Sequence, residues 1–249
     1  MIDIIGVSKS FGDKVVLKDV SLRVHEGGTT ALFGPSGTGK SVLIKHIIGL
    51  IEPDEGNVIV DGVSIPSASR RELNEVRQRV GYVFQGSALF DSLSVGENIR
   101  LGMDIDGCRR TAEECEARII ECLRLVNLDP EVAELYPIEL SGGMQKRVAI
   151  ARAFAGHQRY LLYDEPTTGL DPENAFIISS LIEHLQEEIG VTSIMVTHDI
   201  ENGFRVADRV ALLHQGGIRF EGTVDEFRNT DDPVVRRFVS PSEEIAGVY

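Results

Sequence analysis

Residues 34–41, GPSGTGKS, match the spacing G-x-x-x-x-G-K-[ST] and lie between the apolar runs TTALF and SVLIKHIIGL. Glycines let successive backbone N–H groups point at a phosphate, and the N-terminus of a following helix adds positive potential. We expect Lys40 to contact the β- and γ-phosphates and the Ser41 hydroxyl to ligate Mg²⁺. The motif therefore predicts a nucleotide-phosphate site made of Gly34, Pro35, Ser36, Gly37, Thr38, Gly39, Lys40 and Ser41.

The run YLLYDEP places two acids, Asp164 and Glu165, directly after four apolar or aromatic residues typical of a buried parallel strand. Ligands of open α/β sheets bind at the carboxyl ends of strands. Asp164 can complete a Mg²⁺ coordination shell there, and Glu165 can act as general base on a water aligned with the γ-phosphate. Taken alone, such a pair is usually a solvated turn, but beside GPSGTGKS it indicates phosphate chemistry.

A second anion-binding sequence occurs at residues 140–147, LSGGMQKR. In the simplest reading Ser141 is the N-cap of an amphipathic helix that continues as MQKRVAIARAFA. The exposed N–H groups and dipole of a helix that begins Ser141-Gly142-Gly143 also suit an anion. Because residues 34–41 already form a complete phosphate cradle, this spare site suggests a nucleotide held by another copy of the chain.

With these motifs in order, the chain resembles the ATP-binding cassette of ABC transporters from about residue 1 to residue 228. The resemblance implies four further nucleotide-responsive residues: Phe11 stacking on adenine, Gln85 linking nucleotide state to the membrane partner, Asp171 at the dimer interface, and His198 at the γ-phosphate. The family more often has Tyr at the position of Phe11. Each of the four also has an ordinary structural explanation, such as an N-cap for Asp171, which precedes Pro172.

The resemblance implies an ATPase that closes as a homodimer around two Mg·ATP, with both sites active. It implies catalytic roles for Glu165, His198 and Gln85, and Mg²⁺ ligation by Ser41, Gln85 and Asp164. A nucleotide-binding regulator without turnover would be expected to lack Glu165 or His198. An ABC ATPase acting on DNA or ribosomes would need a coiled-coil insertion, a zinc hook or a second cassette.

Apolar residues after Gln85, namely Leu89, Phe90, Leu93 and Val95, predict a surface on which integral membrane permease subunits dock, unless they pack inside the subdomain. The strings SALFDSLSVGENI, LSGGMQKR and GGIRFEGT look most similar to cassettes of Mce-associated, Mla-type phospholipid transporters of bacteria. This resemblance implies phospholipid trafficking with a substrate-binding lipid carrier component. The alternative is a polar amino-acid or other small-solute importer, which YPIELSGG also fits.

Composition restricts the partners. The net charge of −14 argues against a nucleic-acid-binding ATPase and against unaided adsorption to an anionic bilayer. The N-terminus does not read as a signal peptide, and no apolar run approaches about 18 residues. We expect a cytoplasmic protein, peripheral on the inner membrane through its permease. The cysteines at 108, 115 and 122 do not match zinc spacing, and Cys115 and Cys122 are expected to be small core residues.

The pattern as a whole predicts an α/β protein: a phosphate-loop NTPase core with a mainly parallel sheet, an antiparallel β subdomain and a helical subdomain. Thr111 with Glu114 predicts a capping box, and the hairpin VALLHQGGIRFEG closes the core. The simplest interpretation of residues 223–249 is a frayed terminus. The expected boundaries are 1–85 with 159–222 for the ATP-binding core and its β subdomain, 86–158 for the helical signature subdomain, and 223–249 for a C-terminal tail.

Overall fold

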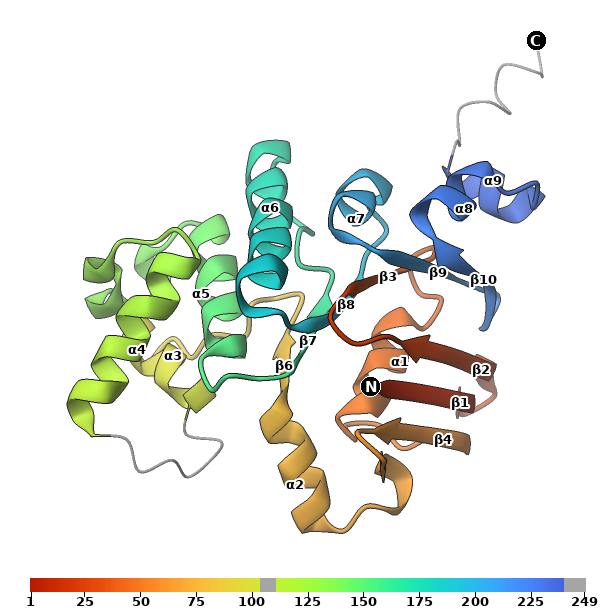
Figure 1. The fold of residues 1–249 in the computed structure, drawn as a ribbon, viewed down its shortest axis with the longest axis horizontal. Helices are drawn as coiled ribbons and strands as arrows, with labels where there is room; N and C mark the ends of the chain where they lie inside the picture. The colour runs from red at the N-terminus through yellow and green to blue at the C-terminus, as the bar shows by residue number, and fades with distance from the viewer. Residues whose placement is uncertain (104–110, 240–249) are drawn as a thin grey trace. The chain divides into compact units, whose positions relative to one another are not determined.

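The computed structural model of the chain describes residues 1–103 and 111–239, which divide into two compact units (Figure 1). The first unit contains Met1–Ser69 and the chain from Ile194 onward, and the second contains Arg70–Ser193. The functional division expected from the sequence remains a prediction. Cys108 and the last ten residues of the expected tail lie outside the described residues.

The first unit contains an antiparallel sheet of order β2-β1-β4-β5. Buried side chains alternate with more exposed ones along its strands, as in β1, where Ile2 and Ile4 are buried. Strands β1 and β2 are joined by a tight turn at Gly12-Asp13, and Phe11 pairs with Lys14 on either side of it. The strands are β1 (Ile2–Phe11), β2 (Lys14–Val24), β4 (Glu55–Val60) and β5 (Val63–Ser64), followed by the short helix η1 (Ile65–Ser67).

The same unit contains the strand that leads into the phosphate motif, β3 (Thr29–Phe33), all five residues of which are buried. It pairs in parallel with β9 (Arg209–His214), which forms the predicted hairpin with β10 (Gly217–Thr223). Two helices follow sites of interest: α1 (Lys40–Ile47) begins at the end of the phosphate motif, and α7 (Ile200–Val206) begins just after His198.

Two C-terminal helices, α8 (Val224–Asn229) and α9 (Pro233–Val239), pack on this sheet. Phe227 and Val235 are fully buried in one cluster with Phe33, the last residue of β3. Burying a phenylalanine stabilises a fold by about 1.5–3 kcal/mol, so this segment is anchored. The expectation of a frayed tail is therefore wrong for residues 224–239, because Phe227 of α8 and Val235 of α9 are both buried.

The second unit contains two parallel strands and a set of helices. Figure 1 shows α3, α4 and α5 side by side within it, and they pack on one another. The capping box of Thr111 and Glu114 is confirmed, as is the burial of Cys115 and Cys122. The elements are α2 (Arg70–Arg79), β6 (Val80–Val83), α3 (Val95–Met103), α4 (Ala112–Leu125), η3 (Pro130–Glu134), η4 (Pro137–Glu139), α5 (Gly142–Phe154), β7 (Tyr160–Asp164) and α6 (Pro172–Ile189).

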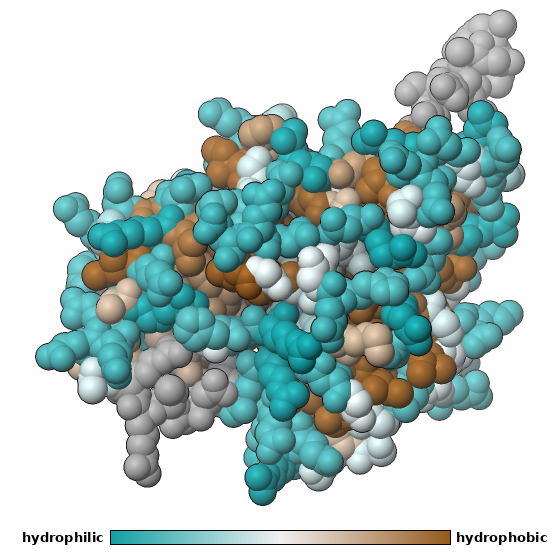
Figure 2. Space-filling model, in the orientation of Figure 1, coloured by the Kyte–Doolittle hydropathy of each residue, from teal (hydrophilic) through white to brown (hydrophobic). Residues whose placement is uncertain are grey.

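Helix α2 was not expected from the sequence. Its residues RRELNEVRQR contain a single buried side chain, Val76, so they show no apolar stripe of helical period. Figure 2 shows a hydrophilic surface over it. Strand β8 (Thr192–Val196) starts in the second unit and continues into the first. Within residues 1–103 and 111–239, no helix is long and apolar enough to cross a membrane.

Candidate functional site

The phosphate motif forms a tight loop between β3 and α1, and its glycines are required by geometry. Gly39 has φ of 103°, and an added Cβ would lie 2.7 Å from Cγ1 of Val16 in β2. A Cβ on Gly34 would collide with the carbonyl oxygen of Leu213. Both neighbours are parts of sheets, so neither can move away cheaply. The loop backbone at these two glycines therefore lies close to the neighbouring strands of the first unit. A phosphate cradle requires such a tightly packed loop.

Lys40 closes this loop on itself. Its buried ammonium donates to the carbonyl oxygens of Gly34 at 2.7 Å and Pro35 at 3.2 Å. The positive charge is thereby held inside the loop, where it can meet the charge of a phosphate. The first turn of α1 follows without a side-chain cap, because the N-cap residue is Gly39. The loop, the charge and the helix N-terminus are thus brought together as the sequence predicts.

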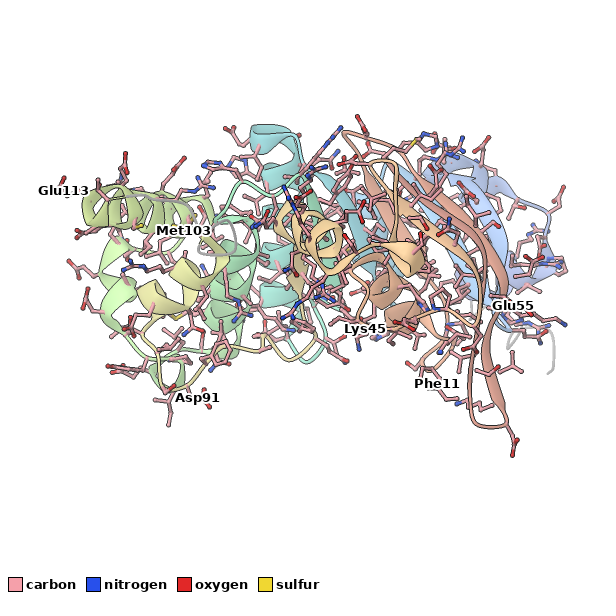
Figure 3. All side chains as sticks on the ribbon, turned by 90° about the horizontal axis from the view of Figure 1, so that it is seen from below. Phe11, Lys45, Glu55, Asp91, Met103 and Glu113 are labelled. Atoms are coloured by element: carbon pink, nitrogen blue, oxygen red, sulfur yellow. The ribbon has the colours of Figure 1, made fainter. Side chains whose placement is uncertain are left out.

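Phe11 and His198 are the other two predicted site residues in the first unit. Phe11 ends β1 and is 49% exposed, with the Lys9 ammonium 5.6 Å from its ring centre. Figure 3 shows it at the turn of the β1–β2 hairpin, and the same hairpin contributes Val16 beside Gly39. His198 is exposed and lies between β8 and Asp199, the N-cap of α7. An exposed aromatic face on this hairpin suits a purine ring.

Asp164 is the last residue of strand β7 in the second unit and Glu165 follows it, and both are buried. The hydroxyl of Tyr82, on the adjacent parallel strand β6, donates to Oδ2 of Asp164 at 2.9 Å. Burial and the charge of Asp164 raise the pKa of Tyr82, so its hydroxyl stays protonated as a donor. Thr168 Oγ1 donates to Oε2 of Glu165 at 2.8 Å. Both carboxylates are held in defined orientations.

Glu165 has a backbone φ of 53°, in the left-handed region. This conformation costs a non-glycine residue about 1–2 kcal/mol. Strain of this kind is concentrated at functional sites, where surrounding structure enforces it. The turn after β7 thus holds the backbone of Glu165 in place at an energetic cost.

Gln85 follows β6 and is exposed, and its backbone is held from α5. The buried ammonium of Lys146 donates to the carbonyl oxygen of Gln85. Burial lowers the pKa of Lys146, while the charges of Asp164 and Glu165 oppose that shift. Lys146 was not predicted from the sequence. The only feature of the sequence that could have indicated it is a basic residue about one and a half helical turns after Ser141, the N-cap of α5.

The signature residues Ser141, Gly142 and Gly143 begin α5. Ser141 is exposed, and its Oγ accepts from the N–H of Met144 at 3.3 Å, which confirms the predicted N-cap. A Cβ on Gly143 would lie 2.6 Å from Oδ1 of Asn174 in α6. Asn174 also donates through its side-chain amide to Asp171, the confirmed N-cap of α6, at 2.7 Å. These bonds lower the pKa of Asp171 and keep it ionised. The structure therefore brings Asp171 and the signature together through Asn174.

The predicted docking residues differ in exposure. Phe90 is 56% exposed, and Leu89 and Leu93 are partly buried. Figure 3 shows the neighbouring Asp91 projecting outward from the second unit. Val95 is fully buried, so its expected place on the surface is wrong. It is the first residue of α3 and one of the buried residues of that helix.

Each unit thus contains part of the predicted set. The first contains Phe11, residues 34–41 and His198, and the second contains Gln85, Ser141 to Gly143, Asp164, Glu165 and Asp171. The Ser41 hydroxyl and the Asp164 carboxylate are hard oxygen donors of the kind Mg²⁺ prefers, so the residues present fit that ion. The roles of these residues remain predictions. Tyr82 and Lys146, which contact them, were not predicted because a contact between distant segments leaves no local sequence pattern.

Comparison with known proteins identifies the family. The sequence profile of the family described as ABC transporter matches residues 17–168. A methionine import ATP-binding protein, MetN, of Carboxydothermus hydrogenoformans is 40% identical over 89% of this chain and 65% of its own length. A probable ribonucleotide transport ATP-binding protein, mkl, of Mycobacterium bovis is 36% identical over 96% of the chain and 66% of its own length. The chain thus spans about two thirds of the length of these relatives.

Comparison with solved structures indicates the same family. A dimeric ATP-binding cassette, MJ0796, in a post-hydrolysis state bound to ADP and Pi, superposes with a TM-score of 0.81 and 35% identity, covering 90% of this chain and 99% of its own. The predicted phosphate-loop NTPase fold of α/β class is confirmed. Cassettes of this family bind ATP with Mg²⁺ and hydrolyse it to drive transport. The chain belongs to the ABC transporter family, as its ATP-binding cassette.

Proposed function

We propose that the chain is the ATP-hydrolysing subunit of an ABC transporter, and that two copies close head to tail around two Mg·ATP. One observation carries the proposal: the chain has a complete phosphate cradle at residues 34–41 and a second anion-binding helix start at Ser141. Each nucleotide would lie between residues 34–41 of one copy and Ser141 to Gly143 of the other. The dimeric state of the related cassette MJ0796 supports this arrangement.

The site residues then have separate tasks. Lys40 binds the β- and γ-phosphates, Phe11 stacks on adenine, and Glu165 accepts the proton of the attacking water. Ser41, Gln85 and Asp164 would hold Mg²⁺, which would supply positive charge against the phosphates. His198 and the partner's Ser141 contact the γ-phosphate. Hydrolysis removes those contacts, so the dimer opens, and Gln85 relays the change to the permease.

The partner surface is proposed to be Leu89, Phe90 and Leu93, which would receive a segment of the permease. An exposed aromatic side chain is a common anchor of protein interfaces. Replacing Phe90 with Asp puts a charge into that contact and should cost about 2 kcal/mol or more of association. Copurification of the cassette with its permease measures this. The matched control is Ile138→Asp, since Ile138 is 87% exposed and lies outside the proposed surface.

Phospholipid trafficking, with a lipid carrier component, is the substrate class we propose, because the strings SALFDSLSVGENI, LSGGMQKR and GGIRFEGT resemble those of Mla-type cassettes. Import of an amino acid is the second candidate, and the 40% identity to a methionine import protein favours it. The complex reconstituted in vesicles decides between them. Transfer of labelled phospholipid supports the first candidate, and uptake of labelled methionine without lipid transfer supports the second.

The proposed location follows from the proposed partner. Held by its permease, the cassette would be peripheral on the cytoplasmic face of the inner membrane. Fractionation with and without the permease tests this: the cassette should move from the membrane fraction to the supernatant when the permease is deleted. A cassette that stays with membranes lacking the permease would contradict it.

A further inference from the structure

The segment between β6 and α3, residues 86–94, contains the proposed docking residues, and we call it the docking segment. Its backbone is held by side chains of the helices around it. The guanidinium of Arg152, near the end of α5, donates to the carbonyl oxygens of Ala88 at 2.7 Å and Ser87 at 2.9 Å. Lys146 of the same helix donates to the carbonyl oxygen of Gln85. Helix α5 thus binds three carbonyls of one short stretch of chain.

The shape that these contacts hold is not one the backbone adopts by itself. Ser87 and Ala88 have φ of 62° and 49°, consecutive left-handed residues without a glycine. Such a conformation persists only where its surroundings enforce it. Beyond them, buried Asn98 of α3 accepts from the N–H of Phe90 at 2.8 Å and donates to its carbonyl oxygen at 3.1 Å. Arg152 is therefore a principal support of the segment's first half.

Helix α5 has the signature residue Ser141 at one end and Arg152 near the other. A helix of this length moves as a rigid body, so a displacement at its N-terminus reaches its last turn. We infer that Arg152 is a positioning residue that ties the signature helix to the docking segment, so that nucleotide contact at Ser141 changes the segment presented to the permease. This inference rests on the proposed function, since it needs Ser141 to meet a nucleotide.

Arg147 of the same helix provides a matched control. It also donates to a main-chain carbonyl oxygen, that of Asn127 at 3.0 Å, in the turn after α4. Arg147→Gln and Arg152→Gln therefore remove the same charge and the same kind of bond from one helix. Only the second bond reaches the docking segment. Arg152→Lys keeps the charge but lacks the fork that spans two carbonyls.

Amide hydrogen exchange measures the order of the docking segment directly, because the N–H groups of Ser87, Ala88 and Phe90 are all hydrogen-bonded. The full chain is measured with Mg·ATP and without it, in a Glu165→Gln background that slows hydrolysis. We expect Arg152→Gln to speed exchange of residues 87–90 by about tenfold without nucleotide. We expect ATP to slow exchange there with Arg152 in place and to have no such effect in Arg152→Gln. Arg152→Lys should be intermediate, and Arg147→Gln should behave as the parent.

The outcomes separate the inference from the proposed function. If ATP fails to protect the amides of residues 142–145 in the parent, the shared nucleotide site is wrong and the inference falls with it. If that protection is present but the ATP response of residues 87–90 is unchanged in Arg152→Gln, the inference alone is overturned. An equal effect of Arg147→Gln would also overturn it, because general loosening of α5 would then explain both. Thermal unfolding of each variant confirms that it is folded, and Arg152→Lys serves if Arg152→Gln is not.

Discussion

The hydroxyl of Tyr82 donates a 2.9 Å hydrogen bond to Oδ2 of Asp164, across the parallel strands β6 and β7. The bond holds the Asp164 carboxylate in a defined orientation at the end of β7. Tyr82 lies on β6, three residues before Gln85. Its bond therefore also links the end of β6 to Asp164, the proposed metal ligand on β7. Neither residue type nor spacing in the sequence indicates this pair.

Removing that hydroxyl should weaken Mg²⁺ binding. Partners that orient a metal ligand are typically worth about tenfold or more in metal affinity, so Tyr82→Phe should raise the Mg²⁺ concentration for half-maximal ATPase activity by about tenfold. Titration of Mn²⁺ in the presence of ATP gives the same affinity without relying on turnover. Nucleotide binding without metal should be unaffected, since Asp164 is not part of the loop at residues 34–41.

The control for this change is Tyr163→Phe, the residue directly before Asp164 on the same buried strand. It loses an equivalent hydroxyl but leaves the bond to Asp164 in place. We expect this variant to have the same metal dependence as the parent protein. A matching Mg²⁺ defect in both variants would mean that packing of β7, and not the bond from Tyr82, is responsible.

His46 of α1 predicts a dependence of stability on pH. Burial lowers its pKa, the bond from Nδ1 to the Val42 carbonyl opposes this shift, and Nε2 has no hydrogen-bond partner among the residues the structure describes. The unfolded chain therefore binds the proton first. Stability is fully present above about pH 6.5 and declines as pH falls toward the lowered pKa. His46→Leu should flatten this decline, as measured by denaturant unfolding at several pH values.

The observable in that experiment is the slope with pH, because the substitution also removes the bond to Val42. The same pH dependence in His46→Leu as in the parent would show that other groups set it.

Two further variants separate binding from hydrolysis. Lys40→Ala removes the charge inside the cradle and should abolish nucleotide affinity of the monomer. Ser141→Arg should leave that affinity intact and stop hydrolysis by blocking the partner's γ-phosphate. Fluorescent nucleotide titration and phosphate release measure the two properties. Thr111→Arg is the matched control, because it also removes a helix N-cap, worth about 1 kcal/mol, at α4. Normal hydrolysis by Ser141→Arg would refute the shared site.

Much of the local structure could be predicted from the sequence. The strand and helix around residues 34–41, the N-cap at Ser141 and the capping box at Thr111 all depend on neighbours in the chain. Helix α2 was missed because its polar residues lack an apolar face. Lys146 and Arg152 were missed because their carbonyl partners are about 60 residues away, at residues 85–88. Val95 was misplaced because exposure depends on which face of α3 turns inward.

The central claim is that ATP holds two copies of this chain together through residues 34–41 and Ser141. Glu165→Gln keeps the cradle but removes the proposed base, so turnover should fall by about 100-fold or more. The most direct test is the mass of this variant in solution by light scattering. With Mg·ATP we expect a dimer that returns to monomer when nucleotide is removed, and that fails to form when Ser141→Arg is added. A variant that stays monomeric with saturating Mg·ATP, or hydrolyses ATP at the parent rate, would contradict the account.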